Sequence, residues 1–324
     1  VTFFCAVAVI NGQITFGMMI STQFIIGMMN GPIMQFVSFI QSAQYAKISF
    51  MRINEIHKLE DEDDTSPIIS NSLALPKDKS LIVKNLSFRY SPHAPIVLKN
   101  INLTIPEGKV TAIVGDSGCG KSTLLKLLLR MYVPSYGEIS IGQMNINNIG
   151  LREWRSKCGC VMQDGKLFND TIQNNIVLNE ENIDYDALKR ATEVACINKE
   201  IEAMPQGYQT TIGEMGRGLS GGQRQRLLIA RALYKKPDYL FLDEATNALD
   251  TINEQKIVKA LNDVFVNRTV IIIAHRLSTI RKADQIVVLK SGSIIETGNH
   301  DQLMQNKQYY YQLIQNQYEL DTKE

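Results

Sequence analysis

The run GDSGCGKSTLL, residues 115–125, constrains the fold of this chain more than any other feature. It follows the apolar run KVTAIV and fits the pattern G-x-x-x-x-G-K-[ST], whose glycines let successive backbone N–H groups close around phosphate oxygens. Such a loop needs a buried strand before it and a helix after it, because the positive N-terminal end of the helix faces the phosphates. The pattern therefore predicts a nucleotide-binding domain of the α/β class.

The side chains of this loop have separate predicted tasks. Lys121 offers ammonium donors to the β- and γ-phosphates, Ser122 is placed to coordinate Mg²⁺, and Thr123 can reach the α- or β-phosphate. One carboxylate, that of Asp116, also lies in the loop and is expected to point outward. The other loop residues expected to surround the phosphates are Gly115, Ser117, Gly118, Cys119 and Gly120.

A second apolar run, YLFLDEA at Tyr239–Ala245, ends in two acidic residues. Open α/β sheets bind ligands at the carboxyl ends of their strands, which is where this run delivers its acids. Asp243 is predicted to hold Mg²⁺ through water, and Glu244 to act as the general base that polarises the attacking water. The alternative is that the two carboxylates only cap a helix.

From Leu81 onward, strand-like and helix-like runs alternate, which indicates a mainly parallel central sheet. The first strand-like runs, LIVKNLSFRY and PIVLKNINLTI, are expected to form a flanking antiparallel sheet. A mainly helical insertion is expected between Gln163 and Gly218. The predicted fold is thus an α/β nucleotide-hydrolase domain with an antiparallel β subdomain and a helical subdomain.

The first 46 residues contain no Asp, Glu, Lys or Arg. The apolar stretch Ile14–Ile40 exceeds the about 20 residues that a membrane helix needs, although a buried helix of a soluble core is an alternative. A secretory signal is disfavoured because no basic segment precedes the apolar run. Basic residues follow the stretch directly, so its end is expected to face the cytoplasm and the turn at Asn11–Gln13 the outside.

These patterns predict three parts: the end of a transmembrane domain at 1–59, a linker at 60–79 and a nucleotide-binding domain at 80–324. The linker begins with the acidic run EDEDDTSP. The formal net charge of +1 argues against a general nucleic-acid binder. The five cysteines show no disulfide framework, and Cys158 and Cys160 are interpreted as structural residues rather than half of a metal site.

The run LSGGQ at Leu219–Gln223 narrows the prediction, because here the sequence resembles the ATP-binding cassette (ABC) family. The resemblance extends from Leu81 to the C-terminus, with the motifs in the family's order. It implies that Gln163 belongs to the Q-loop, Asn247–Asp250 to the D-loop, and His275 is the switch histidine. Tyr90 then stacks on adenine, and the catalytic set is Glu244, His275 and Gln163, with Gln163 also beside Mg²⁺.

The same resemblance implies a partner, since two cassettes of this family face each other head to tail. The signature residues of one subunit, which are Leu219–Gln223 in this chain, complete the ATP site of the other subunit. A homodimer is the simplest arrangement. The residues expected to reach the partner's ATP are Ser220, Gly221, Gly222, Gln223 and Asp250.

The membrane-like segment favours an exporter subunit of the cell membrane, with a cytoplasmic ATPase, over a soluble cassette ATPase that acts on nucleic acid. The stretch MQDGKLFNDTIQNNI is similar to that of peptide and bacteriocin exporters with an N-terminal peptidase domain, which would lie before residue 1. A lipid or multidrug exporter is the alternative, but such exporters more often have proline in this stretch, and this sequence has none there.

Overall fold

The computed structural model describes residues 2–58, 76–178, 182–213, 216, 218–245, 251–274 and 277–321. The chain divides into two compact units, Val1–Thr65 and Ser66–Glu324. The predicted domain limits near 60 and 80 fall in or beside the undescribed stretch 59–75, so they stay predictions, and the acidic run lies outside the described residues.

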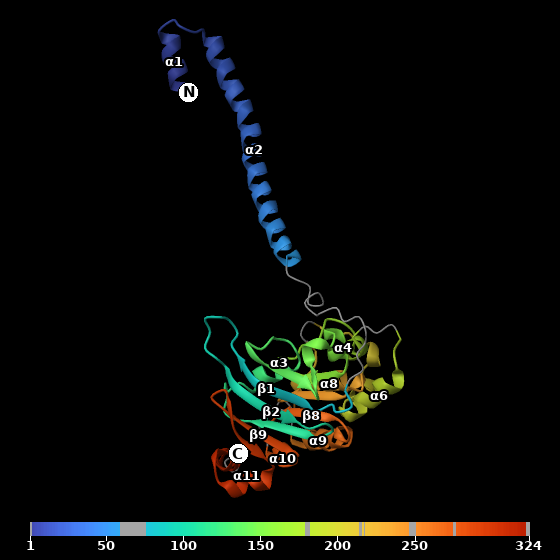
Figure 1. Cartoon of the computed structure of the whole chain (residues 1–324). Coiled ribbons are helices and arrows are strands. Elements are labelled where there is room, and N and C mark those ends of the chain that lie inside the picture. Colours follow the sequence, from blue (N-terminus) through green and yellow to red (C-terminus); the bar gives the residue numbers. More distant parts are fainter. Residues whose placement is uncertain are drawn as a thin grey trace. The chain divides into compact units, whose positions relative to one another are not determined.

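The first unit consists of two helices, α1 (Thr2–Ile10) and α2 (Phe16–His57), joined by the predicted turn (Figure 1). The hydroxyl of Thr15 caps α2 by accepting a hydrogen bond from the backbone N–H of Met18 at 3.3 Å. Helix α2 has 42 residues, contains Pro32 without interruption and buries none of its residues. At about 1.5 Å per residue it is roughly 63 Å long, and by length and composition it qualifies as a membrane span.

The second unit contains a four-stranded antiparallel sheet with the order β2-β1-β4-β5. Strands β1 and β2 alternate buried and exposed side chains along much of their length, so the sheet presents one apolar face to the interior. Its strands are β1 (Leu81–Phe88), β2 (Leu98–Ile105), β4 (Tyr136–Ile141) and β5 (Met144–Asn145).

A second sheet of six strands has the order β10-β9-β3-β8-β7-β6 and is parallel except for the β9–β10 pair. The side chains of its central strands are almost all buried, as expected for a sheet covered on both faces. Its strands are β3 (Val110–Val114), β6 (Cys158–Val161), β7 (Tyr239–Asp243), β8 (Thr269–Ile273), β9 (Gln285–Lys290) and β10 (Ser293–Gly298).

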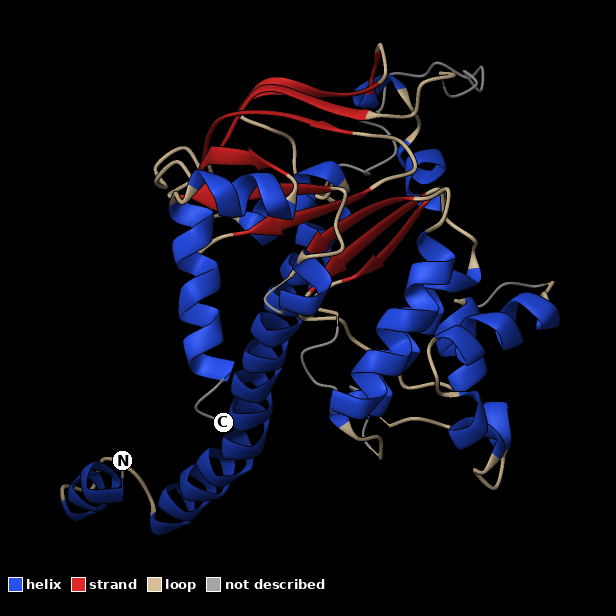
Figure 2. Cartoon of the chain, turned by 90° about the horizontal axis from the view of Figure 1, so that it is seen from below, coloured by secondary structure: helices blue, strands red, loops and turns tan. Residues whose placement is uncertain are grey.

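Helices cover both faces of this sheet, and the two sheets form separate layers (Figure 2). The segment between Gln163 and Gly218 is mainly helical, as predicted. The α-helices of the unit are α3 (Lys121–Leu128), α4 (Leu151–Ser156), α5 (Ile172–Val177), α6 (Tyr185–Val194), α7 (Asn198–Glu202), α8 (Gly221–Tyr234), α9 (Thr251–Phe265), α10 (Leu277–Ile280), α11 (His300–Asn306) and α12 (Tyr309–Asp321), with short 3-10 helices at Ile146–Asn148 and Gly207–Gln209.

Two apolar cores hold these layers together, and β3 contributes to both because its side chains alternate between faces. Ala112 and Val114 belong to the core beneath the helical part, whereas Ile113 belongs to the core that α3 shares with the four-stranded sheet. The loop after β3 is thereby held between both layers. The predicted α/β architecture, with its antiparallel and helical subdomains and a preceding apolar helix, is confirmed.

Candidate functional site

The glycine-rich loop runs from the end of β3 to the start of α3, and two of its glycines are required by the packing. Gly115 has φ of 147°, and a Cβ added there would lie 2.0 Å from the carbonyl oxygen of Leu289. Gly120, the N-cap of α3, has φ of 108°, and its Cβ would lie 2.7 Å from a methyl carbon of Leu98. The loop therefore keeps its curvature only with glycine at both positions.

Lys121 is the first residue of α3, and its side chain curls back over the loop. Its ammonium group donates hydrogen bonds to the carbonyl oxygens of Gly115 and Asp116, both at 2.8 Å. Only 6% of the residue is exposed. An ammonium group has three donors, so one remains beyond these two bonds for a phosphate oxygen.

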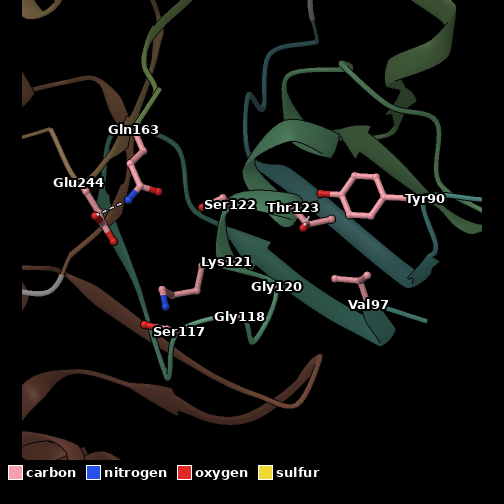
Figure 3. A pocket seen from close by; sticks show the side chains of 10 residues that line it. All are labelled: Tyr90, Val97, Ser117, Gly118, Gly120, Lys121, Ser122, Thr123, Gln163 and Glu244. Atoms are coloured by element: carbon pink, nitrogen blue, oxygen red, sulfur yellow. Dashed lines mark hydrogen bonds between the residues drawn. The ribbon is translucent and has the colours of Figure 1, made fainter. Parts of the chain in front are cut away.

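The loop, the ends of β1 and β7 and the segment after β6 enclose a cavity of about 460 Å³ (Figure 3). A cavity of this size, with a lysine at a helix N-terminus and a carboxylate opposite, suits a nucleotide phosphate group. It brings together most of the predicted loop residues and adds one unpredicted apolar side chain. The lining residues are Tyr90, Val97, Ser117, Gly118, Gly120, Lys121, Ser122, Thr123, Gln163 and Glu244.

Asp243 ends β7 beside this cavity and is buried, with 2% of its surface exposed. Burial raises the pKa of its carboxyl, while a hydrogen bond from the Ser122 hydroxyl acts in the opposite direction. Its oxygen Oδ1 has no hydrogen-bond partner within the described part of the chain. A buried carboxylate with a free oxygen beside a serine hydroxyl fits Mg²⁺, which uses few protein ligands when it bridges phosphates.

Glu244, directly after β7, has the left-handed φ of 52°. Hydrogen bonds hold both its backbone and its carboxylate: its N–H donates to Ile273 O at 3.2 Å, its carbonyl accepts from Gln225 Nε2 at 2.9 Å, and its carboxylate accepts from Gln163 Nε2 at 3.1 Å. The Gln163 amide lies between Glu244 and Ser122 in Figure 3. The carboxylate is thus directed into the cavity, on the opposite side from the loop.

Tyr90 lies at the other end of the cavity, just beyond β1 (Figure 3). The edges and faces of Phe88 and Tyr132 brace its ring, with centroid separations of 5.0 and 5.3 Å. Its hydroxyl lies 2.9 Å from the hydroxyl oxygen of Thr123. An exposed aromatic ring in this position can stack on a nucleotide base while its hydroxyl contacts the helix that receives the phosphates.

The predicted signature residues form the start of α8 rather than part of this cavity. Ser220 Oγ accepts from the N–H of Gln223 at 3.1 Å, and Gln223 Oε1 accepts from the N–H of Ser220 at 2.9 Å, which is a complete capping box. Ser220 and Gly221 are exposed. Of the described residues, none at positions 219–223 lines the cavity that contains Lys121.

An acidic residue from the helical subdomain holds this helix in place. Glu200 in α7 accepts two hydrogen bonds from Arg226, at 2.6 and 3.0 Å, and one from Gln223 Nε2 at 2.9 Å. Arg226 is buried and also donates to the carbonyl oxygen of Cys196 at 2.8 Å. The bidentate pair fixes the first two turns of α8 against the helical subdomain.

Several predicted residues lie apart from the cavity. Gly115 and Cys119 belong to the loop but do not line the cavity; Cys119 is buried, which raises the pKa of its thiol. His275 and Asp250, with the rest of the predicted D-loop, lie outside the described residues. Sequence reasoning missed Val97, Tyr132 and Glu200, whose positions carry no motif and are recognisable only from their contacts.

Comparison with known proteins gives a family and several relatives. Residues 98–247 match the family described as ABC transporter. The chain is 40% identical over 306 residues to the exotoxin translocation ATP-binding protein PaxB of Pasteurella aerogenes, which covers 94% of this chain and 42% of that protein. It is 39% identical over 307 residues to the leukotoxin translocation ATP-binding protein LktB of Mannheimia haemolytica, covering 94% of this chain and 43% of that protein.

A solved structure of a bacterial Atm1-family ABC exporter with ATP bound matches with a TM-score of 0.78 and 36% sequence identity. The match covers 85% of this chain and 47% of that chain. The chain therefore spans less than half of the length of these relatives.

Proposed function

This chain belongs to the ABC transporter family, and on that premise we propose that it is the ATP-hydrolysing part of an exporter. The observation that carries the proposal is the cavity in which Lys121, Ser122, Gln163 and Glu244 converge, next to the buried Asp243. A phosphate-binding lysine and a carboxylate base face each other across it. That arrangement suits hydrolysis of a terminal phosphate better than binding alone.

The loop residues and Lys121 bind the phosphates, and Tyr90 stacks on the adenine. Ser122, Gln163 and Asp243 would hold Mg²⁺, which supplies positive charge to the β- and γ-phosphate oxygens when bound. Glu244 accepts a proton from water as the water oxygen attacks the γ-phosphorus. The bond from that phosphorus to the bridging oxygen breaks, and ADP and inorganic phosphate are released. His275 is assigned the role of the switch histidine by resemblance to the family.

The functional unit is proposed to be a head-to-tail dimer of two such cassettes. Support comes from the exposed N-terminal end of α8, which presents Ser220 and Gly221 away from the cavity of its own chain. A helix N-terminus of this kind attracts a γ-phosphate. Each subunit would contribute its loop to one site and Ser220–Gln223 and Asp250 to the other, and a second copy of the same protein is the simplest partner.

Helix α2 is proposed to cross the cell membrane, because it is long, apolar and without buried residues. Its first 25 residues, positions 16–40, have no charge, whereas Lys47 and Arg52 follow on the same helix. The basic end then faces the cytoplasm, and the ATPase domain lies on that side. The segment at 1–59 is the end of the transmembrane part, 60–79 a linker and 80–324 the nucleotide-binding domain.

The exported cargo is proposed to be a polypeptide. The relatives PaxB and LktB are named for translocation of an exotoxin and a leukotoxin, and both are about as similar to this chain as the Atm1-family exporter. These names favour a protein toxin over the bacteriocin-like peptide that the stretch after Gln163 suggested. A lipid or drug cargo is the competing possibility, and nucleic acid is not a proposed substrate.

The variant Glu244→Gln tests the proposal, since glutamine keeps the size of the side chain but cannot accept the proton. Hydrolysis of ATP should fall by about 10² or more while ATP still binds. Lys121→Ala should instead lose nucleotide affinity. In the source cell, Glu244→Gln should remove at least one polypeptide from the secreted fraction, which mass spectrometry identifies.

A parent-like hydrolysis rate in Glu244→Gln would reject the assignment of the base. An unchanged set of secreted polypeptides, together with lost hydrolysis, would reject the polypeptide cargo and leave the ATPase intact as a proposal. Asp164→Asn is a matched control, because Asp164 is the exposed carboxylate next to Gln163 and is absent from the cavity lining. It should hydrolyse ATP at about the parent rate.

A further inference from the structure

The phosphate-binding loop carries an acidic side chain, Asp116, whose charge has the same sign as the ligand the loop is built to hold. The backbone carbonyl of Asp116 accepts a hydrogen bond from the Lys121 ammonium group at 2.8 Å. Asp116 is therefore in direct contact with the lysine that is expected to bind the phosphates. A carboxylate free to turn toward a triphosphate would weaken its binding, because like charges at short range repel.

The carboxylate of Asp116 is instead bound to the C-terminal part of the chain. The hydroxyl of Tyr309, the first residue of α12, donates a hydrogen bond to Asp116 Oδ2. The ammonium group of Lys290 lies over the Tyr309 ring, 4.0 Å from its centroid. Partial burial and the neighbouring carboxylate raise the pKa of the Tyr309 hydroxyl to about 12, so it remains a donor at neutral pH.

The position of Tyr309 is determined by the residue after it. Tyr310 is completely buried, its N–H donates to Glu296 Oε1 at 2.9 Å, and its hydroxyl lies 2.7 Å from Nδ1 of His300. The start of α12 is therefore anchored to β10 and α11 independently of the loop. Tyr309 is a fixed point to which the loop carboxylate is bound.

We propose that Tyr309 is a positioning residue for the nucleotide site: its hydroxyl holds the Asp116 carboxylate against α12 and away from the phosphates. The C-terminal helix thereby sets the affinity of the loop for nucleotide. The proposal rests on the proposed ATPase function and adds a residue that lies 193 positions from its partner in the chain. Tyr309 acts through Asp116 and does not itself touch the nucleotide.

The variant Tyr309→Phe removes only the hydroxyl and leaves the carboxylate without this donor. We expect the dissociation constant for MgADP and the KM for MgATP to rise about three- to tenfold, which corresponds to the net contribution of about 1 kcal/mol that a typical hydrogen bond makes. The kcat at saturating MgATP should stay within about twofold, because Asp243 and Glu244 are unchanged. Calorimetric titration and steady-state hydrolysis of the full chain measure these quantities.

Asp116→Asn provides the rescue, because it removes the charge that needs restraint. It should bind MgADP at least as tightly as the parent, and adding Tyr309→Phe to it should change the affinity by less than about twofold, as expected if the two residues act through one contact. The deficit of Tyr309→Phe relative to the parent should also shrink as ionic strength rises from about 0.05 to 0.5 M.

Tyr311→Phe is the matched control: its hydroxyl accepts a hydrogen bond from Gln315 on the same helix, at 2.8 Å, and it should leave nucleotide affinity unchanged. Equal affinities of Tyr309→Phe and Tyr311→Phe would overturn the proposal. Weaker MgADP binding by Asp116→Asn alone would also overturn it, because the proposal holds that the Asp116 charge opposes nucleotide binding. A parent chain that binds no MgADP would instead reject the proposed function on which the inference rests.

Discussion

At the scale of single residues, Glu244 has a backbone conformation that is unfavourable for a glutamate and is held by its hydrogen-bond partners. A glutamate at φ of 52° is in the left-handed region, which costs a non-glycine residue roughly 1–2 kcal/mol. Hydrogen bonds to Ile273, Gln225 and Gln163 offset this cost and fix both the backbone and the carboxylate. The carboxylate is therefore oriented before any water arrives, as a general base requires.

Tyr90 provides a second prediction at this scale. Stacking on the base depends on the ring, whereas the bond to Thr123 depends on the hydroxyl. Tyr90→Phe should weaken MgADP binding by no more than about fivefold, because a neutral hydrogen bond contributes about 1 kcal/mol or less here. Tyr90→Ala should lose roughly 1–3 kcal/mol of stacking as well. Calorimetric titration of both variants measures the difference.

The ring edges of Phe88 and Tyr132 should still brace Phe at position 90, so the comparison isolates the hydroxyl. Since stacking tolerates different bases, MgGDP should follow the same order of affinities as MgADP. If Tyr90→Phe and Tyr90→Ala bind MgADP with the same affinity, Tyr90 does not stack on the base.

At the scale of elements, helix α8 depends on a neighbouring helix as well as on its own cap. The capping box of Ser220 and Gln223 is local, but the buried Arg226 in the second turn needs the carboxylate of Glu200 from α7. A buried guanidinium without a counter-charge is strongly unfavourable. The orientation of the signature residues is therefore set by contact between the helical subdomain and α8.

Glu200→Gln should lower the free energy of unfolding of the cassette by about 1–3 kcal/mol, because one neutral acceptor replaces a bidentate carboxylate that is partly screened by solvent. Urea denaturation followed by tryptophan fluorescence measures this, since Trp154 is the chain's one tryptophan and is completely buried in the cassette. Glu202→Gln, in the same helix, is the control: Glu202 accepts from Asn198 at 3.0 Å and should change stability little. If Glu200→Gln and the parent had the same free energy of unfolding, the buried Arg226 would not need the carboxylate of Glu200.

At the scale of the whole molecule, the predicted motifs are distributed over two surfaces of one chain. The cavity holds the loop, Gln163 and Glu244, whereas Ser220 and Gly221 are exposed at the start of α8. In the proposed dimer, each chain therefore contributes two different half-sites, the cavity to one ATP site and the start of α8 to the other. Loss of either half-site in all subunits then abolishes hydrolysis, although each subunit keeps one intact half.

Mixing two inactive variants tests this arrangement. Ser220→Asp keeps a good N-cap but places a negative charge where the partner's γ-phosphate is expected, and Lys121→Ala removes the phosphate donor. Each variant alone should hydrolyse ATP at less than about a hundredth of the parent rate. Mixed dimers contain one site in which both halves are intact, so co-expression should restore measurable hydrolysis. A mixture as inactive as its components contradicts sites shared between subunits.

The local patterns determined the parts of the fold that depend on neighbouring residues. The alternation of apolar runs predicted the strands of the parallel sheet, and the glycine pattern predicted the loop between β3 and α3, because both reflect backbone sterics and burial along a short stretch. The long charge-free segment predicted an apolar helix, and the structure extends it without interruption from Phe16 to His57. Nine of the eighteen predicted site residues also line one cavity.

The remaining features were decided by tertiary packing. Nothing near Tyr309 in the chain indicates that its hydroxyl meets Asp116, and nothing near Glu200 indicates that it pairs with Arg226. Such contacts depend on how distant elements are placed by the two cores, and no local pattern encodes that placement. The chemistry of the site can therefore be predicted from short motifs. The contacts that hold its loop and its signature helix exist only in the folded chain, because each joins distant segments that packing alone brings within hydrogen-bond distance.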